Sequence, residues 1–277
     1  MWQTHRLQES QSHRGCTAVI HQPYFLPWLG YFSKLCFCDV LVLLDNVHFS
    51  KQHYIDRTKI IDMHGQVTWL SLPTGQNPGI PIRDVALRPP DNRSLQNVIE
   101  TVRTSYSKAM EFDSEWPRLR QLLGEAFDKH QHKLMLLDID VHLIKGLLTQ
   151  LGITVPHIVL ASEITSASDP TARLCDICTA LDVTNLLVGA GRSRAVHNFE
   201  SLRQCGISIQ IQDYSAMHPV YSQSRRRSSG FVSGLSIIDA LMNVGSERVR
   251  TFISEGRYSP TLLVEEYPGG VAYDSGV

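Results

Sequence analysis

The sequence has no long hydrophobic run and almost no net charge. None of its apolar stretches approaches the roughly 18 residues of a membrane span, so we expect no membrane partner. Its 26 Lys and Arg residues oppose 27 Asp and Glu residues, so any contact with nucleic acid would need a local basic patch. Residues 1–15 lack the apolar segment of a secretory signal. We therefore expect a cytoplasmic protein.

Signatures of covalent and metal catalysis are also missing. No segment resembles a nucleophile elbow or a paired metal site. Cys175 and Cys178 have the spacing of half a zinc site, but no second pair stands at zinc-finger spacing. The helical pattern around these two cysteines favours core packing. We predict no metal site, and a redox or metal role of the two cysteines is left open.

Two short apolar runs, residues 16–20 and 40–44, give the clearest structural signal. Such runs, bounded by polar residues, indicate strands that are buried on both faces, and the segment between them contains a helical pattern. Strand, helix and strand over this length predict a right-handed parallel βαβ unit. Ligands bind outside the carboxyl ends of such strands, which is where His21, Gln22, Asp45 and Asn46 lie.

The helix predicted between the runs begins near Pro27. Gly30 falls in its first turn, where the missing side chain lets a phosphate or carboxylate approach free backbone N–H groups. Packing alone is the other explanation of this glycine. We count it among the substrate-binding candidates, together with Tyr24, Trp28, Tyr31 and Lys34.

Residues 47–59 follow the second run and carry several cations. Lys51 and Arg57 can pair with a phosphate or carboxylate, Arg through a bidentate fork and Lys as a point charge. The alternative is a solvated loop with surface ion pairs.

A glycine turn follows the strand predicted at residues 185–188. Gly189, Gly191 and Arg192 in this turn can present donors to an anion, although tight strand-to-helix turns use glycine anyway. After the last predicted strand, residues 207–211, come three further binding candidates, Asp213, Tyr214 and Tyr221. The basic run at residues 225–227 is either solvated or able to steer a tRNA.

Apolar residues repeat at three- and four-residue spacing between 93 and 151, which predicts a helical block. We interpret residues 92–151 as an insertion or cap on a single α/β domain, residues 16–255. Strands predicted at 157–160, 185–188 and 207–211 continue the alternation, which indicates a mostly parallel Rossmann-like sheet. Residues 1–15 are expected to be a disordered extension and residues 256–277 a loose tail.

The chain resembles the WbqC-like protein family across most of its length, from about residue 16 to 253. The residues that carry this resemblance are His21-Gln22-Pro23-Tyr24, Pro27-Trp28, Gly30-Tyr31-Phe32, Lys34, Asp39, Leu44-Asp45, Val47, Phe49, Lys51, Arg57, Trp69-Leu70, Gly206-Ile207 and Leu235-Ser236-Ile237-Ile238-Asp239. The resemblance implies a small cytoplasmic protein of sugar-polymer or natural-product biosynthesis. It also implies transfer of glycine or another aminoacyl group to an amine.

The architecture is also similar to the nucleotidylyltransferase and class I synthetase superfamily, in which a His-x-Gly-His motif binds ATP phosphates. Here Gly30 is followed by Tyr31, and its spacing from His21 is longer. The likeness therefore supports the fold and leaves nucleotidyl transfer in doubt.

The candidate catalytic residues are His21, Asp45, Lys51 and Arg57. His21 can take a proton from an attacking amine, and Asp45 can orient His21 or bind an ammonium, a ribose hydroxyl or a metal. We expect an aminoacyl transferase with an amine acceptor and an activated donor, of which aminoacyl-tRNA is one form. The alternatives are an ATP- and magnesium-dependent ligase or nucleotidylyltransferase, and a non-catalytic nucleotide- or sugar-binding protein. The cofactor and the oligomeric state are left open.

Overall fold

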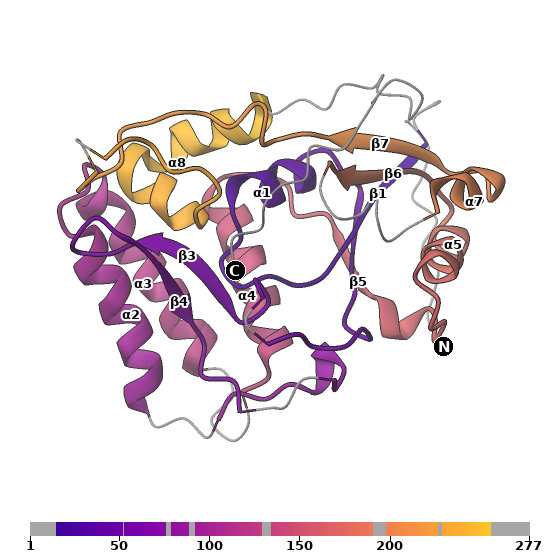
Figure 1. Ribbon diagram of the computed structural model, residues 1–277, viewed down its shortest axis with the longest axis horizontal. Coiled ribbons are helices and arrows are strands. Elements are labelled where there is room, and N and C mark those ends of the chain that lie inside the picture. The colour runs from indigo at the N-terminus through magenta and orange to yellow at the C-terminus, as the bar shows by residue number, and fades with distance from the viewer. Residues whose placement is uncertain are drawn as a thin grey trace.

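The computed structural model describes residues 15–51, 53–75, 79–88, 92–128, 134–190, 198–226 and 229–255. Its centre is a sheet of five parallel strands, ordered β5-β2-β1-β6-β7 (Figure 1). The strands are β1 (Cys16–His21), β2 (Val40–Leu43), β5 (His157–Leu160), β6 (Val183–Gly189) and β7 (Ser208–Gln212). This sheet, with helices packed on it, confirms the predicted α/β Rossmann-like fold.

The strand order fixes where a ligand would bind. Along the chain, the first three strands of this sheet are laid down from the middle outward as β1, β2 and β5, and the next two, β6 and β7, extend it on the other side. The order therefore reverses between β1 and β6. In doubly wound sheets this reversal opens a crevice at the carboxyl ends of the two strands. His21 ends β1 and Gly189 ends β6.

Helices cover the sheet on both faces (Figure 1). Val19 packs into the larger core, with α1 (Leu29–Leu35) and α8 (Ile237–Glu255). Its neighbour Ala18 packs into a second core, with α5 (Pro170–Ala180) and α7 (Phe199–Gln204). Successive strand residues point to opposite faces, so both faces of β1 are buried. This is why its sequence is a continuous apolar run rather than an alternating one.

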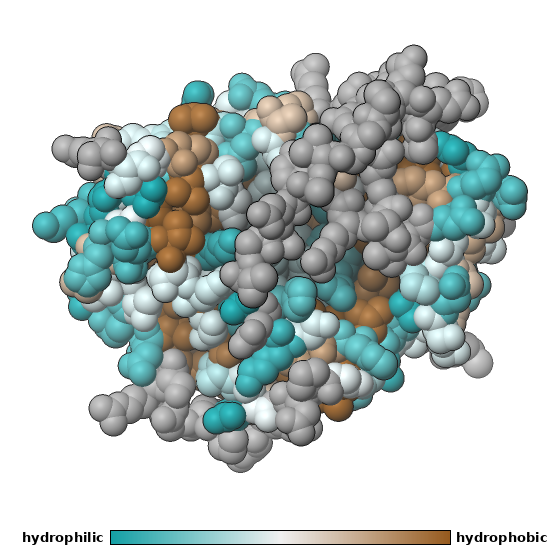
Figure 2. Space-filling model, viewed as in Figure 1, coloured by the Kyte–Doolittle hydropathy of each residue, from teal (hydrophilic) through white to brown (hydrophobic). Residues whose placement is uncertain are grey.

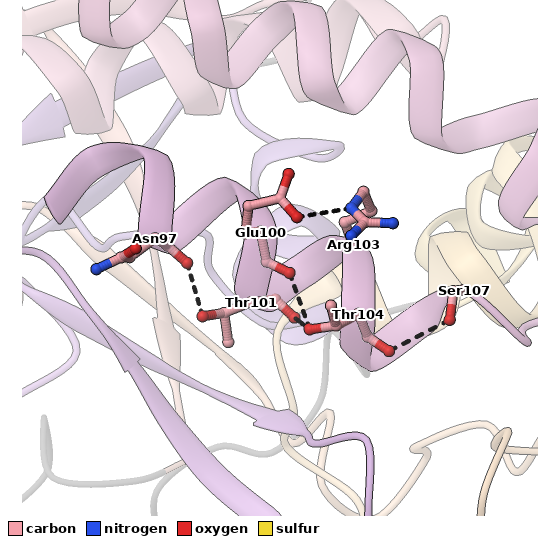
Figure 3. Close-up of polar contacts among 6 residues, drawn as sticks. All are labelled: Asn97, Glu100, Thr101, Arg103, Thr104 and Ser107. Atoms are coloured by element: carbon pink, nitrogen blue, oxygen red, sulfur yellow. Dashed lines mark hydrogen bonds and ion pairs between the residues drawn. The ribbon is translucent and has the colours of Figure 1, made fainter. Parts of the chain in front are cut away.

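Three helices form the predicted helical block: α2 (Asn92–Tyr106), α3 (Phe112–Asp128) and α4 (Leu136–Gln150). Their apolar faces belong to the same core as α1 and α8. The exposed face of α2 is polar (Figure 3): Thr101 and Thr104 donate to the carbonyls of Asn97 and Glu100, one turn earlier. The hydroxyls of both threonines are thus hydrogen-bonded to the backbone of their own helix.

A two-stranded antiparallel hairpin, β3 (Arg57–Ile61) and β4 (Val67–Ser71), stands apart from the main sheet. β3 is not among the predicted strands, because its first three residues, Arg57, Thr58 and Lys59, are all polar. Thr58 and Ile60 are buried, whereas Arg57 and Lys59 are only half-buried. Residues 57–59 therefore belong to a strand and not to the polar connection expected at 47–59. Short one-turn helices, η1 (Ile82–Asp84) and η2 (Ala161–Glu163), lie in the connections.

The basic run 225–227 is not simply solvated. Arg225 donates to the carbonyls of Thr104 and Ser105, at the end of α2, and of Met63. A cation at these last carbonyls complements the negative end of the helix dipole. Arg226 likewise donates to the carbonyl of Gly65, and Arg227 lies outside the described residues. These contacts give Arg225 and Arg226 a structural role. Within the described residues no helix combines the length and hydrophobicity that a membrane crossing requires.

Candidate functional site

His21 lies at the carboxyl end of β1, enclosed by two aromatic rings. Its ring centroid lies 4.7 Å from that of Tyr24 and 4.8 Å from that of Tyr31, both in edge-on contact. Nδ1 of His21 lies 2.9 Å from the carbonyl oxygen of Gln22. A carbonyl only accepts, so Nδ1 carries the proton and Nε2 the lone pair. Nε2 has no hydrogen-bond partner among the described residues, which leaves it available to a ligand.

The environment keeps the His21 imidazole neutral. Burial lowers the pKa of His21 to about 3, and the nearby Lys34 ammonium contributes to the lowering, while the Gln22 carbonyl opposes it. At neutral pH the ring is therefore uncharged and can accept a proton or a hydrogen bond through Nε2.

Lys34, on α1, is a buried cation near His21, at the same strand reversal. Only 7% of its surface is exposed, and its Nζ lies 5.8 Å from the centroid of the Tyr31 ring. The same Nζ lies 3.9 Å from the point that a Cβ atom on Gly189 would occupy. Burial lowers the pKa of Lys34 to about 8. Among the described residues no carboxylate forms an ion pair with Lys34, so the ammonium is available to a ligand anion.

Trp28 accounts for the glycine at position 30. A Cβ atom on Gly30 would lie 2.5 Å from the Trp28 indole, which covers this position. The packing explanation is therefore sufficient, and ligand approach to Gly30 stays a prediction. The helix α1 begins at Leu29, after Trp28 as N-cap, two residues later than Pro27.

Asp45 and Asn46 tie the end of β2 to η2 and to the residues after it, one strand away from the reversal. The buried carboxylate of Asp45 accepts from the Ser162 backbone N–H at 2.9 Å and from the Ser162 hydroxyl at 2.6 Å. Asn46 donates to the carbonyl of Thr165. The Asp45 side chain is thus hydrogen-bonded to Ser162, and within the described residues it forms no hydrogen bond to His21. Asn46 also lines a hydroxyl-rich pocket of about 510 Å³ above β2 and β5.

Lys51 and Arg57 do come together, but at the hairpin rather than in the crevice. They line a pocket of about 320 Å³ with Asp56, Thr74 and Arg88. Arg88 was not predicted, because nothing in the sequence around it distinguishes it from a surface arginine.

Three of the aromatic candidates belong to packed networks. Tyr214 is buried, contacts the Trp28 ring and donates to the carbonyl of Phe252. Tyr221 donates to the buried carboxylate of Asp239, on α8. Tyr24 lies between the rings of His21 and Tyr54.

The other candidates lie at or beyond the strand ends. Asp213 follows β7 and accepts from the backbone N–H of Ala216. Gln22 contributes its carbonyl, which also accepts from the Tyr31 hydroxyl at 3.4 Å. Gly191 and Arg192 lie outside the described residues. The part of the chain that the structure describes holds no group of three His, Cys, Asp or Glu residues placed to bind a metal, and Sγ of Cys175 lies 2.8 Å from that of Cys205.

The lowered pKa of His21 predicts a defined pH dependence of stability. The unfolded chain binds a proton at the ordinary pKa of 6.5, whereas the folded chain binds it near 3. The contribution of neutral His21 to the free energy of unfolding is therefore complete above about pH 6.5. It is lost as the pH falls towards 3, by up to about 1.4 kcal/mol per pH unit. We expect a His21→Gln variant to show a shallower loss in urea titrations across this range. Parallel curves for the two proteins would contradict a neutral, desolvated His21.

The fold and the groups at the strand reversal define the class of protein. It is a doubly wound parallel α/β protein in which His21 and Lys34 lie at the reversal of strand order, where such proteins bind ligands. Within this class the chain belongs to the WbqC-like protein family, whose model matches residues 22–251.

A relative in Mycobacterium tuberculosis bears the name "Uncharacterized protein Rv1507c". It is 24% identical over 239 residues, which cover 83% of this chain and 94% of the relative. No solved structure matches the chain.

Proposed function

We propose that the protein transfers an aminoacyl group, glycyl among the candidates, from an activated donor to an amine of a sugar or small-molecule intermediate in biosynthesis. The observation that carries this proposal is the pairing of a neutral imidazole with a buried, unpaired ammonium at the strand reversal. His21 has a pKa of about 3 and Lys34 a pKa of about 8. Perturbed titrating groups in a crevice favour a catalytic role over a silent binding protein.

The reaction we propose is a direct displacement. The acceptor nitrogen attacks the donor's carbonyl carbon and forms the C–N bond, while the carbonyl oxygen takes up the negative charge. The Lys34 ammonium stabilises this oxyanion, as preorganised cations do at developing charge. Nε2 of His21 takes the proton from the attacking nitrogen and returns it to the leaving oxygen as the C–O bond breaks. No acyl-enzyme is formed, and no cofactor is needed when the donor arrives already activated.

A pKa of about 3 makes His21 a weak base in the free protein. Part of the lowering comes from the positive charge of Lys34. An anionic group, or the oxyanion itself, beside Lys34 offsets that charge and raises the pKa of His21. The base thus strengthens when the substrate is bound, which limits proton transfer in the empty crevice.

The strand order itself favours a second candidate, an ATP- and magnesium-dependent ligase or nucleotidylyltransferase. Doubly wound sheets whose strand order reverses between the first and the fourth strand of the sheet, here β1 and β6, bind nucleotides at that reversal. In that reaction Lys34 would contact a phosphate, and pyrophosphate would be released.

One pair of assays separates the two candidates. Transfer is measured from preformed [14C]glycyl-tRNA to hydroxylamine or glucosamine without ATP, and exchange of labelled pyrophosphate into ATP is measured with free amino acids. We expect protein-dependent amide or hydroxamate in the first assay and no exchange in the second. Exchange that depends on an amino acid, without ATP-free transfer, would contradict our proposal and support the ligase.

A further inference from the structure

The outer face of the β3–β4 hairpin combines cations with an exposed tryptophan. Residues that pair directly across an antiparallel ladder share a face. Arg57 pairs with Ser71, and Lys59 pairs with Trp69. The opposite face, with Thr58, Ile60 and Leu70, is buried. Arg57, Lys59, Trp69 and Ser71 therefore lie together on the face away from the core.

Trp69 stays accessible in spite of its neighbours. Its ring lies 3.8 Å from the Arg57 guanidinium carbon and 5.2 Å from Nζ of Lys59, yet 37% of its surface is exposed. Val67 and Met63, further along the hairpin, are 42% and 51% exposed. Figure 2 shows hydrophobic and hydrophilic residues intermixed on the left of this view, where the hairpin and α8 lie in Figure 1. An exposed aromatic ring flanked by cations is a surface on which a nucleic-acid base can stack.

The pocket of about 320 Å³ begins at the same end of the hairpin face. Arg57 and Ser71 line it, together with Lys51 and Arg88. Lys51, Arg57 and Arg88 form no ion pair with a carboxylate of the described chain. Asp56, the acidic residue of the lining, is buried and accepts from the Thr74 hydroxyl at 3.2 Å. The pocket thus holds an excess of positive charge, and guanidinium groups match the geometry of a phosphate.

The distance between the pocket and Trp69 fits one ligand. Arg57 and Lys59 are two residues apart on one face of β3, and Trp69 and Ser71 are two residues apart on the same face of β4. The members of each pair therefore lie roughly 7 Å apart along their strand. A phosphate in the pocket would therefore leave its own nucleoside next to Trp69. The net charge of the chain is nearly zero. Electrostatic attraction of an anionic ligand would therefore come from this local concentration of cations.

We propose that this pocket and the hairpin face bind a nucleotide: the phosphate contacts Lys51, Arg57 and Arg88, and the base stacks against Trp69. The site rests on the proposed function in one respect, since it would hold the nucleotide end of the activated aminoacyl donor. A continuous run of ring contacts, His21 to Tyr24, Tyr24 to Tyr54 and Tyr54 to Trp69, joins the two sites. The nucleotide is thereby assigned to the hairpin and the acyl group to the crevice.

Titration calorimetry with the full chain tests the proposal. The ligands are AMP, inorganic phosphate and 4′-phosphopantetheine. We expect AMP to bind about tenfold more tightly than phosphate, in line with a single stacked base. Trp69→Leu should remove that difference and leave phosphate binding unchanged. Arg88→Met should weaken AMP and phosphate alike, about tenfold or more, whereas Arg118→Met, an exposed arginine on α3, should weaken neither.

Four results would overturn the nucleotide site. AMP and phosphate binding equally would indicate a bare anion pocket, and no binding of either at millimolar concentration would remove the pocket altogether. Phosphopantetheine binding as tightly as AMP, without dependence on Trp69, would point to a carrier protein. Equal weakening of AMP and phosphate by Trp69→Leu would leave the preference for AMP intact, so the base would not be stacked on Trp69. These binding measurements do not depend on acyl transfer. If AMP does not bind but amide still forms in the transfer assay, this site alone is refuted. If AMP binds but no amide forms, the proposed reaction alone is refuted.

Discussion

Replacement of His21 by alanine is expected to lower ATP-free glycyl transfer by about 100- to 10,000-fold, the usual contribution of a positioned general base. The loss should appear in kcat, because Nε2 acts in the chemical step, as the C–N bond forms and the C–O bond breaks. The ring packs between Tyr24 and Tyr31, so the folded state of the variant is checked by circular dichroism and thermal unfolding.

The matched control is His157→Ala. His157 is exposed and begins β5 at the opposite, amino-terminal edge of the same sheet. Its removal should leave transfer unchanged. A folded His21→Ala protein with full activity would exclude His21 from the mechanism, whichever reaction the protein catalyses.

Replacement of Lys34 by methionine is expected to stabilise the protein and to lower the rate of transfer. Burial of the Lys34 ammonium lowers its pKa from 10.5 to about 8, which corresponds to a cost of about 3 kcal/mol for keeping it charged at neutral pH. Methionine fills a similar volume without that cost. We therefore expect the free energy of unfolding at pH 7 to rise by up to about 3 kcal/mol, while transfer falls at least 100-fold because the oxyanion loses its cation.

The sign of the pH dependence gives an independent check on Lys34. Between pH 8 and 10.5 the unfolded chain binds this proton and the folded chain does not, so the wild-type protein gains stability relative to Lys34→Met as the pH rises. The exposed Lys145, on α4, supplies the control variant Lys145→Met, which should change neither stability nor transfer. A less stable but active Lys34→Met protein would show that Lys34 serves packing alone.

β1 and β2 could be predicted from the sequence because they are buried on both faces. The largely apolar runs at 16–20 and 40–44 form β1 and β2, and the short apolar run after His157 forms the edge strand β5. β3 could not be predicted in this way. Its half-buried positions, Arg57 and Lys59, are cations, and among the described strands it pairs with β4 alone, so its sequence resembles a polar connection.

The candidate site was predictable only where proximity follows from topology. His21 and Lys34 are joined by one βαβ unit, and their meeting follows from the crossover. Asp45 was expected beside His21, but its hydrogen-bond partner Ser162 lies 117 residues away, a separation that no local pattern encodes. Arg225 was treated as a solvated or tRNA-steering residue for the same reason, since the carbonyls that it binds come from α2.

The most direct test of the central claim is to locate the acyl group on the protein. Bromoacetyl-glycyl-tRNA carries an alkylating group on the amino nitrogen of the transferred glycine, close to the reacting carbonyl, and the modified residue is identified by peptide mass spectrometry. A Cys205→Ser background avoids competition from the exposed thiol of Cys205. We predict alkylation of His21, lost in the His21→Ala variant. Alkylation that maps to Lys51 or to another residue outside the crevice would contradict the assignment of acyl transfer to the reversal between β1 and β6.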